Sequence, residues 1–113
     1  MASTSGGLTP QPLNLSDAVA YNEGAVVSRT LVNQPGGTLT LFAFDADQEL
    51  SEHTAPFDAV AQVLEGEVII TVAGQPQRVR AGEMLLMPAH VPHALKAATR
   101  FKMLLTMIRT AKD

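Results

Sequence analysis

The sequence contains no cysteine and no tryptophan, and its aromatic residues are four phenylalanines and one tyrosine. Without cysteine, the chain can form neither a disulfide framework nor a thiolate metal site. This composition suits a reducing compartment, and we expect the protein in the cytoplasm. With so few aromatic side chains, the core has to be built from Val, Leu, Ile, Ala and the five methionines.

Positive charge is also scarce, with eight Lys and Arg residues against eleven Asp and Glu residues and a net charge of −3. A nucleic-acid-binding domain needs a basic patch or stripe, so we do not expect a nucleic-acid partner. No apolar run approaches the roughly 20 residues that a membrane-spanning helix needs, so we expect no membrane partner either.

The size and composition fit one globular domain, with 113 residues of which 46% are hydrophobic and 17% charged. No internal repeat or linker divides the chain. The first residues are small and polar, and we interpret residues 1–12 as a flexible N-terminal lead-in. Residues 13–113 then form the folded domain.

Short apolar runs separated by turn residues follow the lead-in. We expect Ser16 and Asp17 to start a helical turn, and the turn Glu65-Gly66-Glu67 to join two strands as a hairpin. Short strands at this spacing are typical of an all-β sandwich or barrel, with an open immunoglobulin-type sandwich as the alternative. The expected strands cover residues 25–32, 38–44, 60–64, 68–72, 77–80, 84–87, 94–97 and 101–108. The acidic stretch of Asp45, Asp47, Glu49 and Glu52 is expected to be a solvated loop.

Two stretches combine histidine with turn residues inside strand-like sequence. The first covers residues 53–67, HTAPFDAVAQVLEGE, and the second covers residues 82–93, GEMLLMPAHVPH. Together they resemble the two motifs of the cupin superfamily, the RmlC-like jelly-roll β-barrels. The resemblance spans residues 38–108 and implies an all-β, single-domain cupin double-stranded β-helix with a short N-terminal extension.

The first cupin motif usually carries two histidines, then a glutamate, then a glycine. Aligned on Gly66, these positions hold His53, Ala55 and Ala59. In the second motif, Gly82, Pro88 and His93 match, whereas His90 stands where a glycine is usual. The structural positions of the motifs are therefore present, while two positions that usually bind metal carry alanine.

The resemblance implies a metal site in the mouth of the barrel, where side chains from adjacent strands converge. We expect His53 and His93, each at the start of a strand, to face one pocket, with His90 as a possible third ligand. Imidazole nitrogen suits divalent Fe, Ni, Zn, Mn or Cu. Asp58 and Gln62 are further possible donors, although strand alternation turns both away from the lumen.

The face of the last strand that carries Met103, Leu105 and Met107, with Phe101 extending it, is expected to line an apolar and adaptable pocket. Alanine at positions 55 and 59 widens such a pocket and removes a negative charge. We therefore expect a small apolar or aromatic ligand. The predicted pocket residues are Ala55, Ala59, Gln62, Met84, Phe101, Met103, Leu105 and Met107.

Three functions remain open from the sequence. The first is a small-molecule-binding barrel whose pocket around His53 and His93 holds a divalent metal in an atypical site with few ligands. The second is a metal-dependent enzyme of dioxygenase, isomerase or lyase type acting on a small organic substrate. The third is an assembly role, since the resemblance implies a homodimer and residues 25–44 are apolar enough to supply an interface.

Overall fold

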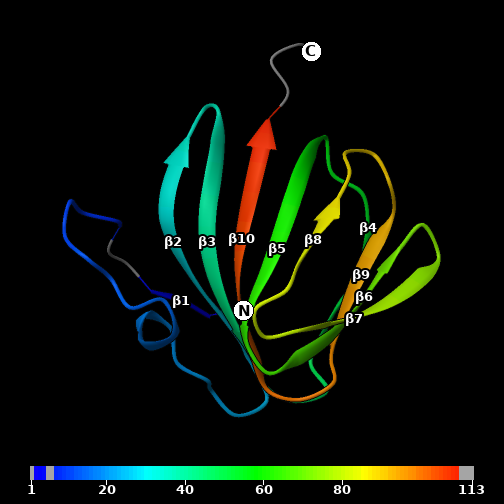
Figure 1. Ribbon diagram of the computed structural model, residues 1–113, viewed down its shortest axis with the longest axis horizontal. Helices are drawn as coiled ribbons and strands as arrows, with labels where there is room; N and C mark the ends of the chain where they lie inside the picture. The colour runs from blue at the N-terminus through cyan, green and yellow to red at the C-terminus, as the bar shows by residue number, and fades with distance from the viewer. Residues whose placement is uncertain (1, 5–6, 110–113) are drawn as a thin grey trace.

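Two β-sheets face each other in the computed structural model, which describes residues 2–4 and 7–109 (Figure 1). All neighbouring strands pair antiparallel except β1, which pairs parallel to β2. The predicted all-β jelly-roll barrel is confirmed. In spatial order the larger sheet contains β1 (Ala2–Thr4), β2 (Val26–Gln34), β3 (Gly37–Phe44), β10 (Phe101–Arg109), β5 (Phe57–Glu65) and β8 (Met84–Met87). The smaller sheet contains β4 (Glu49–His53), β9 (His93–Ala97), β6 (Glu67–Val72) and β7 (Gln75–Arg80).

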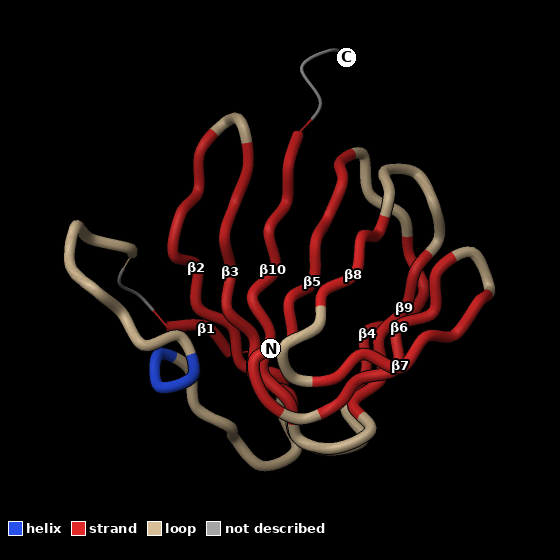
Figure 2. The backbone as a smooth tube through the Cα atoms, viewed as in Figure 1, coloured by secondary structure: helices blue, strands red, loops and turns tan. Residues whose placement is uncertain are grey.

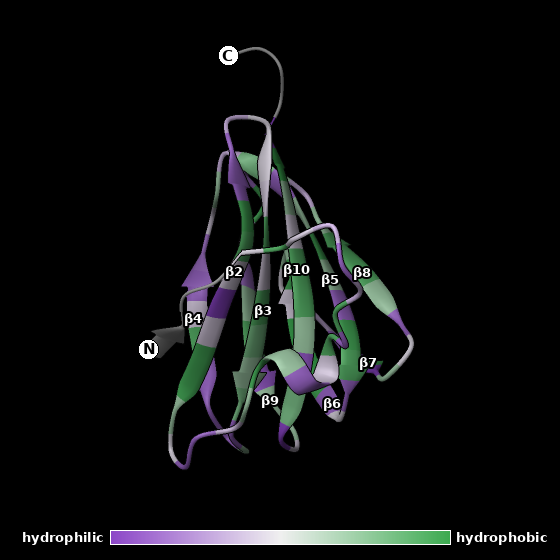
Figure 3. Ribbon diagram, turned by 90° about the vertical axis from the view of Figure 1, so that its left-hand side faces the viewer, coloured by the Kyte–Doolittle hydropathy of each residue, from purple (hydrophilic) through white to green (hydrophobic). Residues whose placement is uncertain are grey.

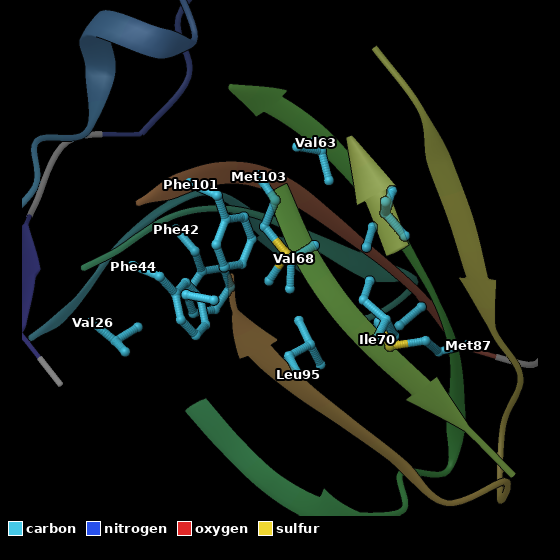
Figure 4. Close-up of a cluster of buried hydrophobic side chains, with 14 residues drawn as sticks. Val26, Phe42, Phe44, Val63, Val68, Ile70, Met87, Leu95, Phe101 and Met103 are labelled. Carbon is cyan, nitrogen blue, oxygen red and sulfur yellow. The ribbon is translucent and has the colours of Figure 1, made fainter. Parts of the chain in front are cut away.

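The core lies between the two sheets, because alternate residues of each strand point inward. In β5, for example, Ala59, Ala61 and Val63 are buried, and the residues between them are partly exposed. Figure 3 shows hydrophobic and hydrophilic residues following one another along β2 and β5. The core is mainly aliphatic, as the composition requires, with a small aromatic group in which the rings of Phe44 and Phe101 stack at 4.6 Å (Figure 4).

The prediction that Glu65-Gly66-Glu67 forms a hairpin is wrong. Strand β5 belongs to the larger sheet and β6 to the smaller one, so the chain changes sheets at Gly66. Gly66 has a φ of +78°, and a Cβ there would collide with the carbonyl oxygen of Arg100. The true hairpin in this region joins β6 to β7 through Ala73 and Gly74.

The acidic stretch is a loop only in its first half. Residues Glu49–His53 form β4, which pairs with β9 through the partners Glu49–Lys96 and Leu50–Leu95. His53 therefore ends a strand, whereas His93 begins one as expected. Strand β4 is mostly exposed, and Leu50 is the apolar side chain that it packs against the core. The strand is therefore stabilised mainly by its hydrogen bonds to β9 and less by burial of its side chains.

The turn before β4 is held by Asp45. Its carboxylate accepts hydrogen bonds from the backbone N–H groups of Gly24 and Ala46 and pairs with the Arg100 guanidinium at 2.7 Å. The Gly24 amide and Arg100 together lower the pKa of Asp45 to about 2, because both stabilise the charged carboxylate. The same pairing raises the pKa of Arg100 above its ordinary value.

The segment before β2 covers the outer face of the larger sheet. It contains the predicted helical turn as a 3-10 turn, η1 (Ser16–Ala18), drawn in blue in Figure 2. The hydroxyl of Tyr21 donates to Glu65 at 2.7 Å, and burial together with this carboxylate raises the pKa of Tyr21 above its usual range. The apolar residues beneath the segment are Val27, Leu31, Leu41 and Ala43. The outer face of residues 25–44, which was expected to supply an interface, is thus largely covered by the chain itself.

The outer face of β10, β5 and β8 carries apolar side chains that remain exposed. Met84 is 62% exposed, Leu86 is 53% exposed and Ile108 is 51% exposed. They alternate with the inward-facing residues of their strands, and Leu86 pairs with the half-buried Val60 on β5. We call Val60, Met84, Leu86 and Ile108 the outer apolar patch.

The described part of the chain contains no helix of the length and hydrophobicity that crossing a membrane requires. The predicted lead-in over residues 1–12 lies partly outside the described residues. Of the lead-in, Ala2–Thr4 form β1, and the Leu8 amide donates to the carbonyl of Leu31 at 2.8 Å.

Candidate functional site

The pairing of β4 with β9 brings His53 and His93 together. The two residues are direct partners across the ladder, following an irregularity in register after Leu50. Their ring centroids lie 4.3 Å apart with the planes at 68°. His93 is buried, with 6% of its surface exposed, whereas His53 lies at the exposed end of its strand. The structure therefore places these two predicted site residues side by side.

Each imidazole of the pair is oriented by a backbone carbonyl two residues earlier. The Nδ1 of His53 lies 2.9 Å from the oxygen of Ser51, and the Nδ1 of His93 lies 3.1 Å from the oxygen of Val91. A carbonyl can only accept, so Nδ1 must carry the proton in both rings, and this assignment follows from the hydrogen bonds. The two Nε2 atoms then present lone pairs to the same place.

The Nε2 atoms of His53 and His93 lie 3.1 Å apart. Two facing lone pairs repel unless a proton or a cation lies between or beside them. Metal–nitrogen bonds are about 2.0–2.1 Å long. If the nitrogen–metal–nitrogen angle lies between the square-planar and the tetrahedral value, the two ligand nitrogens are about 2.9–3.4 Å apart. The pair therefore fits two adjacent ligands of one divalent metal, with Nε2 as donor and Nδ1 held by a carbonyl.

Nowhere in residues 2–4 and 7–109 do three or more His, Asp or Glu side chains gather closely enough to hold a metal ion. In the described residues, His53 and His93 therefore stand as a pair of donors without a third His, Asp or Glu side chain beside them. Structural metal sites are usually four-coordinate, and catalytic zinc sites usually keep three protein ligands. The donor set here fits a metal ion that takes further ligands from elsewhere.

A cavity of about 350 Å³ adjoins the histidine pair. Its wall is formed by side chains from both sheets, including Leu95 of β9 and Met103 of β10. His53 and His93 are its ionisable residues, and the remainder is apolar apart from Thr54. The cavity therefore has one polar end and an apolar body, as small-molecule sites commonly do.

Several of the predicted pocket residues line this cavity. Ala55 and Ala59 lie on its wall beside Met103, Leu105 and Met107. Since alternate residues of β10 face inward, the three long side chains form one continuous strip opposite the smaller sheet. The alanines leave open the space that larger side chains would fill.

Other predicted pocket residues lie elsewhere. Gln62 is on the outer side of β5, because its neighbours Ala61 and Val63 are the buried, inward residues. Met84 is its partner on β8 and is 62% exposed on the same outer side. Phe101 faces inward but is not part of the cavity wall; it is fully buried at the start of β10 and stacks on Phe44.

The two remaining candidate ligands are also absent from the cavity wall. His90 is exposed and outside the cavity wall, with its backbone N–H donating to the carbonyl of Ala55 at 2.7 Å. Asp58 accepts a hydrogen bond from the backbone N–H of Ala89 at 2.8 Å. The main chain of residue 90 and the carboxylate of Asp58 thus tie the loop before His93 to the first motif, without a contact from the His90 imidazole to the histidine pair.

Part of the cavity wall was not predicted from the sequence. Pro56 and Phe57 come three and four residues after His53 and could have been found from the motif, whereas Leu50 lies in the stretch that was assigned as a loop. Met87 is both buried in the core and part of the wall. The wall residues missed by the sequence analysis are Leu50, Thr54, Pro56, Phe57, Met87 and Leu95.

The fold and the paired histidines at the end of the barrel define a jelly-roll barrel with a small-molecule-sized cavity. The family model described as the cupin domain matches residues 40–109, more than half of the chain. The protein belongs to the cupin family, as the two motifs indicated. No curated protein matches the chain significantly.

Solved structures support this assignment. A conserved protein of unknown function from Streptococcus pyogenes is 35% identical, with a TM-score of 0.87 over 92% of this chain and 91% of that chain. A cupin superfamily protein from Desulfitobacterium hafniense is 29% identical, with a TM-score of 0.85 over 92% of this chain and 95% of that one. A cupin 2 conserved barrel domain protein from Leptotrichia buccalis is 40% identical, with a TM-score of 0.82 over 86% of this chain and 47% of that chain.

Proposed function

We propose that this cupin barrel binds a small, largely apolar organic molecule in the cavity beside His53 and His93. The observation that carries the proposal is the cavity of about 350 Å³ with an apolar wall and a single polar end. Its size lies within the usual range of about 300–1,000 Å³ for small-molecule pockets. The methionine strip of β10 supports an adaptable fit, because methionine side chains change rotamer easily.

We propose further that the histidine pair holds a divalent metal ion such as Fe, Ni, Zn, Mn or Cu at the polar end of this cavity. The support is the Nε2–Nε2 separation of 3.1 Å together with the carbonyl that fixes each Nδ1. Such an ion would attract an oxygen or nitrogen atom of the bound molecule, and so orient the molecule in the cavity.

Binding is favoured over catalysis by the chemistry of the wall. The ionisable residues on it are the same two histidines that would hold the metal. A dioxygenase, isomerase or lyase that uses general acid–base chemistry would need another titratable group within hydrogen-bond reach of its substrate. Enzymatic activity is therefore the second candidate, and it would depend on the metal for its chemistry.

The test of the metal site is elemental analysis of untagged protein, by plasma mass spectrometry after incubation with each metal and gel filtration. We expect near-stoichiometric metal in the wild type and at least a tenfold loss in His53→Ala and His93→Ala, since one imidazole alone binds a divalent ion weakly. His90→Ala is the matched control and should retain wild-type metal content. Equal metal content in all four proteins would place the metal elsewhere.

We also propose that the protein is a homodimer and works in the cytoplasm. The outer apolar patch supports the first proposal, because exposed and contiguous apolar side chains commonly mark a protein–protein interface. The lack of cysteine supports the second, since the chain can form no disulfide that would need an oxidising compartment.

A further inference from the structure

Phe57 differs from the other aromatic residues of the chain in having no partner for its ring. The other three phenylalanines pack ring against ring, with centroids 6.1 and 4.6 Å apart, and two cations lie over the ring of Tyr21 at 5.1 and 4.9 Å. Within residues 2–4 and 7–109, Phe57 makes no such contact. One face of its ring is therefore open to a partner that does not belong to this part of the chain.

The position of Phe57 places that partner in the cavity. Phe57 is the first residue of β5, lines the cavity wall and is only partly buried. Because side chains alternate along a strand, it shares the inward face of β5 with Ala59 and Ala61. A second ring beside it would add an attraction that exceeds the burial of apolar area alone.

We infer that Phe57 selects ligands that carry a flat aromatic ring over saturated ligands of the same size. This inference rests on the proposed function and specifies the class of its ligand. Phe57 is then a specificity-determining residue, and it belongs to the part of the wall that the sequence analysis missed. The selection is made by side chains of β5 and β10, and it does not involve the histidine pair.

Methionine sulfur on the neighbouring strand favours the same class of ligand. Met107 of β10 pairs with Ala59, so it is the diagonal neighbour of Phe57, and Met103 lies further along the same face. Diagonal neighbours on adjacent strands are roughly 7–8 Å apart and within reach of long side chains. A thioether sulfur attracts an aromatic ring, often at the ring edge, from about 5 Å. A ligand ring beside Phe57 can therefore contact a methionine sulfur as well.

The cavity has room for such a ring. An apolar cavity of about 150 Å³ is large enough for benzene, and the cavity here has about 350 Å³. Leu95 and Leu105 continue the wall beyond the methionines and are apolar. The ring therefore fits with a substituent, and no buried polar group of this part of the wall is left without a partner when the ring enters.

Burial of apolar area alone predicts a different selectivity. A saturated six-membered ring carries more hydrogen atoms than a phenyl ring and removes at least as much apolar surface from water on binding. A cavity without aromatic recognition therefore binds the saturated ring at least as tightly. A preference for the flat ring isolates the contribution of Phe57 and the methionine sulfurs.

The experiment compares benzyl alcohol with cyclohexylmethanol on the untagged full chain. The two neutral alcohols have the same heavy-atom skeleton and the same hydroxyl group, and they differ in whether the ring is aromatic. Titrations followed by the NMR signals of ¹³C-labelled methionine methyl groups give the dissociation constants. We expect benzyl alcohol to bind at least about twofold more tightly, the lower end of the range for an aromatic pair.

The same titrations show where the ring binds. An aromatic ring shifts the signals of nuclei close to its face, so benzyl alcohol should shift the methyl signals of Met103 and Met107 more than cyclohexylmethanol does. Met84 is 62% exposed and is not part of the cavity wall, so its signal should move with neither alcohol. Leucine variants of the single methionines assign the signals.

Phe57→Leu removes the ring and keeps an apolar side chain. We expect this variant to bind benzyl alcohol roughly two- to tenfold more weakly and cyclohexylmethanol as the wild type does, so that the preference disappears. Phe57→Tyr keeps the ring and should keep the preference. Met84→Leu is the matched control outside the cavity and should behave as the wild type. Circular dichroism checks that each variant is folded.

The outcomes separate this inference from the proposed function. If the wild type binds both alcohols without preferring benzyl alcohol, or if the preference survives in Phe57→Leu, the inference is overturned while the cavity still binds small apolar molecules. Loss of the preference in a folded Phe57→Tyr protein would also overturn it. If neither alcohol moves the signals of Met103 and Met107 in the folded wild type, the proposed function itself fails.

Discussion

The backbone of His90 has a φ of +64°, in the left-handed region that non-glycine residues rarely adopt. This conformation costs roughly 1–2 kcal/mol for a residue with a Cβ, whereas glycine adopts it freely but loses about 0.5–1 kcal/mol of extra chain entropy on folding. We therefore expect His90→Gly to raise the free energy of unfolding by up to about 1 kcal/mol. Urea denaturation followed by circular dichroism measures this change.

The neighbouring residue provides the control for His90→Gly. Ala89 does not have a positive φ, so Ala89→Gly should lower the free energy of unfolding by about 0.5–1 kcal/mol. If both glycine variants are destabilised alike, the left-handed backbone at His90 is not a source of strain.

At the residue scale, the structure brings the predicted histidine pair together, whereas some of the predicted pocket residues lie outside the cavity wall. His53 and His93 could be paired because both stand at motif positions whose strands converge in a barrel. Gln62 and Met84 were misplaced because one step along a strand moves a side chain to the opposite face. Strand alternation already argued against Gln62, and the structure shows Gln62 and Met84 as partners on the outer side. Leu50 was missed because its strand was not recognised.

At the scale of the elements, the connection between β5 and β6 depends on Gly66. A Cβ at this position would collide with the Arg100 carbonyl oxygen and approach the Cα of Phe101 to 2.8 Å, in addition to the strain of a φ of +78°. We expect Gly66→Ala to lower the free energy of unfolding by about 2–4 kcal/mol, the sum of backbone strain and overpacking. Thermal unfolding monitored by circular dichroism measures the loss.

Gly74 offers a matched comparison, because its φ is +79° and a Cβ added there would meet no atom within 4 Å beyond its chain neighbours. Gly74→Ala therefore carries the backbone strain alone and should cost about 1–2 kcal/mol. Equal losses in the two variants would show that crowding at Gly66 contributes nothing.

The elements that the sequence identified correctly are those with a strong apolar pattern. Strands β3 and β10 are apolar over most of their length, and both were predicted within a few residues of their observed bounds. Strand β4 lacks this pattern, because Glu49, Ser51 and Glu52 are exposed and its stability comes from pairing with β9. The wrong prediction of a hairpin at Gly66 has a related cause. A tight turn with glycine has the same sequence signal whether the next strand pairs in the same sheet or joins the other sheet.

At the scale of the whole molecule, the outer apolar patch is the surface through which we expect two copies to associate. Substituting Leu86 by lysine places a charge within this surface. In a two-fold symmetric dimer both copies carry the substitution, so the free energy of association is weakened at two positions. We expect Leu86→Lys to weaken dimerisation at least about tenfold, which corresponds to about 1.4 kcal/mol. Analytical ultracentrifugation over a range of concentrations gives the dissociation constant.

Leu8→Lys is the control for this prediction, because Leu8 is 47% exposed but lies on the N-terminal segment beside β2. This variant should dimerise as the wild type does. A wild-type protein that sediments as a monomer at micromolar concentration would contradict the homodimer, and an unchanged Leu86→Lys dimer would place the interface on another surface.

The position of β10 has a consequence for how the protein is made. It is the last of the described strands in the chain, yet it lies between β3 and β5 and supplies Met103, Leu105 and Met107 to the cavity. During translation, β3 and β5 therefore have no common partner until residues 101–109 have left the ribosome. The nascent barrel keeps its apolar interior open until that moment, so its apolar surface is exposed to aggregation until β10 is in place.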